Sequence, residues 1–189
     1  MKKLIYGVGI NDKKGKSKSK EYKLWVSMLK RCYSTKLSEY YPSYSNCFVS
    51  ENFKIFSYFY DWCQKQVGFG EDGYDLDKDL LKKGNREYHE DKCVFIPSEI
   101  NKSLTKSDSI RGVLPLGVCF HKQSNRYRSQ IRIKGKQIDI GYFQSKTEAF
   151  NAYKIKKEEY LKNLADKYYN SIDIRAYQSL IRYKIDIND

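Results

Sequence analysis

The fold of the C-terminal half follows from one segment, Arg126-Tyr127-Arg128-Ser129-Gln130-Ile131-Arg132-Ile133-Lys134. In this stretch apolar or small residues alternate with cations and an amide. Because successive side chains of a β-strand point to opposite faces, the alternation predicts a strand with one buried face and one polar face. The polar face comprises Arg126, Arg128, Gln130, Arg132 and Lys134.

The residues around this stretch predict a small sheet and a helix. Gly117–His121 reads as a preceding strand, Gly135-Lys136 as a tight turn, and Ile138 and Ile140 as the apolar face of a third strand. Ser145–Glu148 has the Ser-x-x-Glu spacing of a capping box, which begins a helix. We expect a three-stranded antiparallel sheet packed on one helix. The apolar stripe of this helix is predicted to comprise Ala149, Ala152, Tyr153, Lys156, Tyr160 and Leu164.

Charge indicates the class of partner. The 189 residues include 36 Lys and Arg against 23 Asp and Glu, a net charge of +13, which favours a polyanion. Apolar residues make up 40% and aromatic residues 15%, which is too much for a disordered tail. No run of apolar residues approaches the roughly 20 that cross a membrane, so we expect a cytoplasmic protein without membrane contact. The five cysteines contain no Cys-x-x-Cys pair, and we interpret them as buried thiols.

The polar strand face predicts a contact with duplex DNA. Between Arg111 and Thr147 there are eight Lys or Arg residues and one acid, Asp139. Like charges on one strand face repel each other, so solvation alone explains them poorly. A three-stranded ribbon fits the DNA major groove, which is about 12 Å wide, and there Arg can pair with guanine and Gln with adenine. Lys136 completes the predicted contact set; an ordinary solvated basic surface is the alternative.

The N-terminal half predicts two helices with aromatic core faces. One helical face carries Tyr22, Trp25, Met28, Leu29 and Cys32, and a second carries Phe53, Phe56, Phe59, Tyr60 and Cys63. Before them, residues 1–20 include Lys13–Lys20 (KKGKSKSK), which is either a basic arm for phosphates or a solvated linker. The predicted organisation is α+β, with this arm, a helical region at 21–104 and a basic domain at 112–189 that ends in a short helix.

A cluster of carboxylates suggests a metal site. Asp75, Asp77 and Asp79 alternate, so on a strand they would share one face and offer oxygen ligands to Mg²⁺. A structural pairing of these acids with neighbouring Lys and Arg residues is the alternative. His89 is the sole nearby imidazole that can take a proton from water near neutral pH.

Two family resemblances extend these expectations. Gly117-Val118, Tyr127–Ile131, Gly135-Lys136, Gly141–Phe143 and Glu148–Tyr153 resemble the AP2 DNA-binding domain of plant transcription factors and phage homing endonucleases. This resemblance covers about 55 residues. It implies a sheet in the major groove with a helix packed behind it.

The segment from Leu76 to Asn101 resembles bacteriophage HNH endonucleases through its LDKD, Gly-Asn, Tyr, Cys, Ile-Pro and Ile-Asn pattern. This resemblance implies a ββα metal fold with a His general base beside an Asp ligand, and with Asn101 as a further ligand beside Asp77 and Asp79. His89 would act as catalytic base only if its loop folds back to the aspartates. Neither aspartate precedes a His, and Lys92 stands where the family has Asn.

Together the resemblances imply a DNA-binding protein of a phage or mobile element, acting in the cytoplasm of a bacterial host. Three roles stay open. The first is a metal-dependent DNA endonuclease or nickase. The second is an inactive scaffold that acts as a regulator. The third is an inhibitor of a host defence nuclease of the CRISPR type, which would bind a host complex of protein and nucleic acid.

Overall fold

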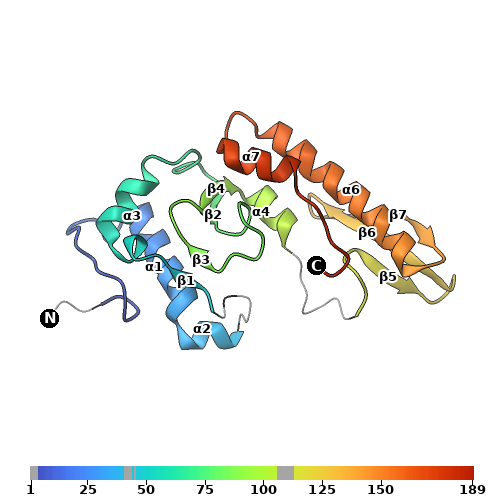
Figure 1. Cartoon of the computed structure of the whole chain (residues 1–189), viewed down its shortest axis with the longest axis horizontal. Helices are drawn as coiled ribbons and strands as arrows, with labels where there is room; N and C mark the ends of the chain where they lie inside the picture. Colours follow the sequence, from blue (N-terminus) through green and yellow to red (C-terminus); the bar gives the residue numbers. More distant parts are fainter. Residues whose placement is uncertain (1–3, 41–43, 45, 106–112) are drawn as a thin grey trace. The chain divides into compact units, whose positions relative to one another are not determined.

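The protein has an α+β fold that divides into two compact units (Figure 1). The computed structural model describes residues 4–40, 44, 46–105 and 113–189. The first unit comprises 1–97 and 171–176, and the second comprises 98–170 and 177–189. Within the described residues, no helix has both the length and the apolar character needed to cross a membrane.

Helices dominate the first unit. The hydroxyl of Ser19 accepts a hydrogen bond from the N–H of Tyr22 at 3.2 Å, and this cap begins the first helix one residue later. The elements in chain order are α1 (Lys20–Tyr33), α2 (Thr35–Tyr40), β1 (Phe48–Val49), the 3₁₀ helix η2 (Asn52–Lys54), α3 (Phe56–Cys63), β2 (Tyr74–Asp77), β3 (Glu87–Tyr88) and β4 (Val94–Pro97). β1 pairs parallel with β3, and β2 pairs antiparallel with β4.

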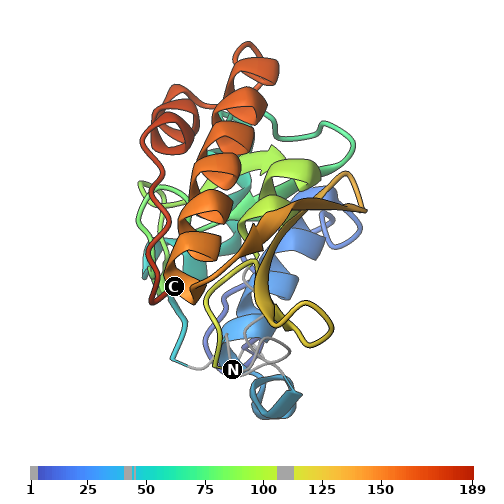
Figure 2. The same cartoon turned by 90° about the vertical axis from the view of Figure 1, so that its right-hand side faces the viewer.

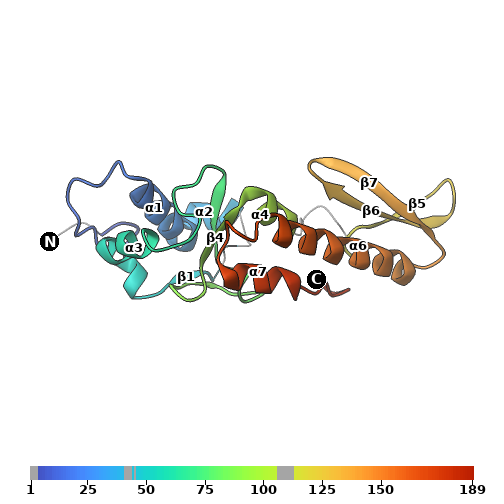
Figure 3. The same cartoon turned by 90° about the horizontal axis from the view of Figure 1, so that it is seen from above.

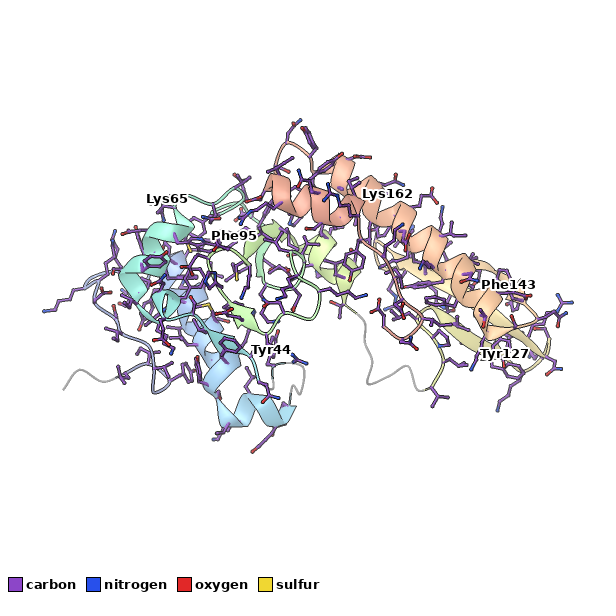
Figure 4. The ribbon with its side chains drawn as sticks, in the orientation of Figure 1. Tyr44, Lys65, Phe95, Tyr127, Phe143 and Lys162 are labelled. Atoms are coloured by element: carbon purple, nitrogen blue, oxygen red, sulfur yellow. The ribbon has the colours of Figure 1, made fainter. Side chains whose placement is uncertain are left out.

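The predicted aromatic helix faces form the core of the first unit. Trp25, Phe53 and Phe56 are fully buried, and the ring of Trp25 lies 5.3 Å from that of Phe56. The indole Nε1 of Trp25 donates to the carbonyl of Phe53 at 2.7 Å, so the one polar atom of this ring is satisfied. Phe95, labelled in Figure 4, joins the same core from β4. The sequence prediction of two core helices is confirmed, although Phe53 lies in η2 and not in α3.

The basic segment Lys13–Lys20 is largely exposed, and its first lysine contacts α3. The Nζ of Lys13 forms an ion pair with Asp61 at 3.1 Å and lies 4.3 Å from the ring centre of Tyr60. Both partners belong to α3. α3 thus supplies an acid and an aromatic face, a combination that holds Lys13, and the role of the exposed lysines that follow stays a prediction.

The second unit is a three-stranded antiparallel sheet with a long helix along one face (Figures 2 and 3). Its elements are α4 (Ser98–Leu104), β5 (Val118–His121), β6 (Arg126–Ile133), β7 (Lys136–Phe143) and α6 (Lys146–Lys167). The strand order is β5-β6-β7. The predicted short C-terminal helix is present as α7 (Ile174–Ile181), but its first residues belong to the first unit and not to the basic domain predicted at 112–189.

The core of the second unit lies between the sheet and α6. Val118 and Ile131 from the strands pack with Ala149, Phe150 and Tyr153 from the helix. Figure 4 labels Tyr127 and Phe143, which pair across β6 and β7 and contact the same cluster. The predicted capping box is present, with the Ser145 hydroxyl accepting from the N–H of Glu148.

The buried stripe of α6 differs from the predicted one. Lys156 is exposed and pairs with Glu159, whereas Lys157 is buried. Phe150 and Leu161 also belong to the stripe. The prediction included Lys156, three residues after Tyr153, in the buried stripe. The helix instead buries Lys157, four residues after Tyr153, and both spacings lie on one face of a helix.

The boundary between the units also differs from the linker that the polar, irregular sequence at 101–111 predicts. It falls between Pro97 and Ser98, and α4 contributes 98–104 to the second unit. The Nζ of Lys167 on α6 pairs with Glu99, which ties α4 to the second unit. The rest of the predicted linker, 106–111, lies outside the described residues.

Candidate nucleic-acid interface

The face of the sheet that points away from α6 carries the predicted interface, and we call it the outer face. Cross-strand partners in a sheet point to the same side. Arg128 pairs with Cys119 on β5 and with Tyr142 on β7, and Arg132 pairs with Gln137. The outer face therefore comprises Cys119, His121, Arg126, Arg128, Gln130, Arg132, Gln137, Asp139 and Tyr142.

Burial along β6 confirms the alternation predicted from its sequence. Ser129 and Ile131 are 0% and 2% exposed, whereas Arg126 and Arg132 are exposed. A bulge follows Ser129, which pairs with Gly141, while the next residue, Gln130, pairs with Asp139. Ile140 is the extra residue on β7, and it packs against the core.

Asp139, the one acidic group of the outer face, is neutralised by Arg128. The Nε of Arg128 donates to Oδ1 of Asp139 at 2.7 Å. This hydrogen bond raises the pKa of Arg128 above its ordinary value. The Nε2 of Gln137 donates to Oε1 of Gln130, and the ring of His121 lies edge-on to Tyr142 at 5.2 Å. These contacts fix the middle of the outer face before any partner binds.

The cations at the two ends of β6 are available for a partner. Within the described residues, the side chains of Arg126 and Arg132 form no ion pair or hydrogen bond. They lie on the same face, six residues apart. Two exposed guanidinium groups on either side of a neutralised centre are suited to anionic groups that are spaced along a strand.

Lys134 and Lys136 do not join this row. Lys134 and Gly135 have φ values of 50° and 78° and form the two-residue turn between β6 and β7. Lys136 pairs with Ile133, so it belongs to the register of the face that α6 covers. The turn predicted at Gly135-Lys136 was therefore one residue too late, and the predicted contact set separates into three locations.

Asp77 and Asp79 already have partners in the protein. The Oδ1 of Asp77 accepts from the N–H groups of Asp79 and Leu80 at 2.9 and 2.7 Å, and burial raises the pKa of Asp77. β2 ends at Asp77, so the strand alternation assumed for Asp79 does not reach it. The Oδ2 of Asp79 pairs at 2.7 Å with Lys78, whose Nζ also donates to the carbonyl of Asn85.

His89 and Asn101 lie in different parts of the chain. The Nδ1 of His89 accepts from the N–H of Asp91 at 3.1 Å and lies 3.5 Å from Glu90. Asn101 is on α4 in the second unit. Among the residues that the structure describes, no group of three His, Cys, Asp or Glu side chains is arranged to hold a metal ion. The Mg²⁺ site and the catalytic base stay predictions from the sequence.

Lys157 and Glu99 are functional candidates that sequence reasoning missed. Lys157 is buried on α6, and Glu99 has a buried carboxylate oxygen without a hydrogen-bond donor in the described chain. The signal for Lys157 was its position four residues after the core residue Tyr153. Glu99 gave no signal, because its partners lie about 70 positions away in sequence.

Comparisons of the chain with protein-family models, with curated proteins and with solved structures found no match. The arrangement of the side chains therefore carries the functional proposal. The outer face contributes most, because a row of cations and amides lies along β6.

Proposed function

We propose that this chain binds duplex DNA through the outer face of β5-β6-β7. The observation that carries the proposal is the row formed by Arg126, Arg128 and Arg132 on the side of β6 that faces away from α6. Arg128 in this row is paired with Asp139, whereas Arg126 and Arg132 form no ion pair within the described residues. A polyanion would give these two guanidinium groups charge-assisted hydrogen bonds.

The dimensions of the sheet suit the major groove. A strand rises about 3.3 Å per residue, so Arg126 and Arg132 lie roughly 20 Å apart along β6. That span corresponds to about six base pairs at 3.4 Å each. Three strands with neighbours about 4.8 Å apart form a ribbon roughly 10 Å wide, which a groove of about 12 Å admits.

The side chains of the outer face offer both kinds of DNA contact. Arg126 and Arg132 can neutralise phosphates or bind guanine through two hydrogen bonds. Gln130 can bind adenine through two hydrogen bonds once its Oε1 is released by Gln137. The order of three strands followed by a helix also agrees with what the AP2 resemblance implies, and this agreement supports the proposal.

The contacts of the carboxylates favour binding over cleavage. A divalent cation at Asp77 would compete with two backbone N–H groups, and at Asp79 it would compete with the ammonium group of Lys78. Mg²⁺ instead requires open oxygen ligands in octahedral geometry. We therefore propose a DNA-binding scaffold that acts without cutting, as a regulator would.

The proposal is tested with a pair of matched double variants. Fluorescence anisotropy would measure the affinity of the full chain for labelled random-sequence duplexes. R126A/R132A should lose about tenfold or more in affinity, because each good arginine contact contributes roughly 1–3 kcal/mol. K156A/K162A removes the same charge from exposed positions on α6 (Lys162 is labelled in Figure 4) and should change the affinity far less. Equal losses in both variants would reject the outer face as the binding surface.

A further inference from the structure

A cavity of about 1030 Å³ lies in the second unit, bounded by α4, the sheet and α6. Its volume reaches the upper end of the ordinary range for small-molecule sites, roughly 300–1,000 Å³. Its lining includes four cations and two tyrosines: Lys102, Arg132, Lys134, Lys157, Tyr153 and Tyr160.

Lys157 is the unusual member of the lining. It is only 8% exposed, and the described residues provide no acidic group or hydrogen-bond acceptor for its Nζ. Its Nζ lies 5.9 Å from the ring centre of Tyr160. Burial alone lowers the pKa of Lys157 to about 8. An uncompensated buried cation is costly, and an anion in the cavity would compensate it.

Glu99 provides a second unmet contact in the same cavity. Its Oε2 is occupied by Lys167 and by the hydroxyl of Tyr168, and the Lys167 contact holds the pKa of Glu99 below its usual range. Its Oε1 is buried and accepts no hydrogen bond within the described residues. Burial and the nearby Glu99 carboxylate raise the pKa of Tyr160, so this hydroxyl shares the site in its protonated form. The cavity thus contains an unpaired cation and an unpaired acceptor.

A ligand that satisfies both contacts has an anionic group at one end and an N–H or O–H donor at the other. Between them, the half-buried ring of Tyr160 offers surface to a flat group. A nucleotide has these three parts: a phosphate, a planar base, and amino or hydroxyl donors. Lys102 and Lys134 add positive charge at the cavity wall.

We propose that this cavity binds a free nucleotide, with its phosphate at Lys157 and a sugar or base donor at Glu99. This site does not depend on DNA binding by the outer face, although four residues of that face also line the cavity: Cys119, Gln130, Arg132 and Gln137. Lys157 recognises the phosphate as a compact point charge. The ring of Tyr160 accepts any base, because every base has a π-face.

Isothermal titration calorimetry of the full chain with AMP, GMP, CMP and UMP tests this site. Wild type should bind at least one of them, and K157M should weaken that binding about tenfold or more through the loss of a charge-assisted hydrogen bond. K162M is the matched control: it makes the same exchange at an exposed position of α6 and should bind as wild type does. Binding by K157M at the affinity of wild type would overturn the proposal.

A second variant keeps the test valid if K157M does not fold. Lys134 has a φ of 50°, a conformation that Asn tolerates well, so K134N preserves the turn and should weaken nucleotide binding several-fold. Two further titrations distinguish the sources of phosphate. Weaker binding of inorganic phosphate than of nucleotide supports the proposal. Binding of a single-stranded oligonucleotide without binding of any mononucleotide overturns it, as does the absence of heat with all four nucleotides.

Discussion

Gly117 is the position where a single methyl group should most clearly test the packing of the sheet on α6. A Cβ built at Gly117 would lie 2.0 Å from the Cδ2 of the Tyr153 ring. Its φ of +73° is a left-handed conformation, which costs a residue with a Cβ roughly 1–2 kcal/mol. Forcing a methyl group into a packed core costs a further ~1–3 kcal/mol. Gly117→Ala should therefore lower the free energy of unfolding by about 2–5 kcal/mol.

Gly135→Ala is the matched control, since Gly135 has a φ of +78° and open space around its Cα. It should cost only the conformational term, about 1–2 kcal/mol. Urea unfolding followed by far-ultraviolet circular dichroism would measure both variants, because α6 is the longest helix that the structure describes. Fluorescence of Trp25 and Trp62 would report the first unit separately. Equal losses at Gly117 and Gly135 would refute the close contact with Tyr153.

Three further predictions concern charged groups. The folded-state pKa of Lys157 is about 8, below its ordinary value of 10.5. Between these two pH values the unfolded chain binds more protons than the folded chain. The free energy of unfolding should therefore rise with pH from about 8 to 10.5 by up to about 3 kcal/mol. K157M should remove that rise in urea titrations across this range. Asp139→Asn frees Arg128, so DNA affinity at low salt should increase, and the slope of log affinity against log salt concentration should steepen by about 0.9. An unchanged slope in anisotropy titrations would show that Arg128 makes no phosphate contact. Mg²⁺ should leave the thermal midpoint of the wild-type chain unchanged and supercoiled plasmid uncut, because Asp77 and Asp79 are already engaged; a raised midpoint or nicked product would restore the metal site.

Local periodicity predicted the elements of the second unit well. The alternation on β6 gave the correct faces because the period of a strand leaves little ambiguity. The capping box at Ser145 gave the correct start of α6, since both of its hydrogen bonds form within four residues. Core aromatics such as Trp25 and Phe56 were also recognised from helical spacing alone.

Features that depend on distant partners were not predicted. Lys13 turned toward α3 because of Asp61, 48 positions later in the sequence. Asp79 lost its expected strand position because Asp77 ends β2 by accepting two backbone N–H groups. The burial of Lys157 depends on the packing of α6 against its neighbours, which helical periodicity leaves open by one residue. Sequence patterns determine which face of a helix or strand is buried and where the element begins or ends. Tertiary packing determines the contacts of individual charged groups.

The salt dependence of duplex DNA binding tests the central claim most directly. If Arg126 and Arg132 each displace a counterion while Arg128 stays paired with Asp139, the logarithm of the affinity should fall with the logarithm of salt concentration at a slope of about −1.8 or steeper. R126A/R132A should reduce the steepness by up to about 1.8, and K156A/K162A should leave it near the wild-type value. Anisotropy titrations from low to physiological salt would measure these slopes. An affinity that does not change with salt, or a slope that R126A/R132A leaves unaltered, would contradict DNA binding by the outer face.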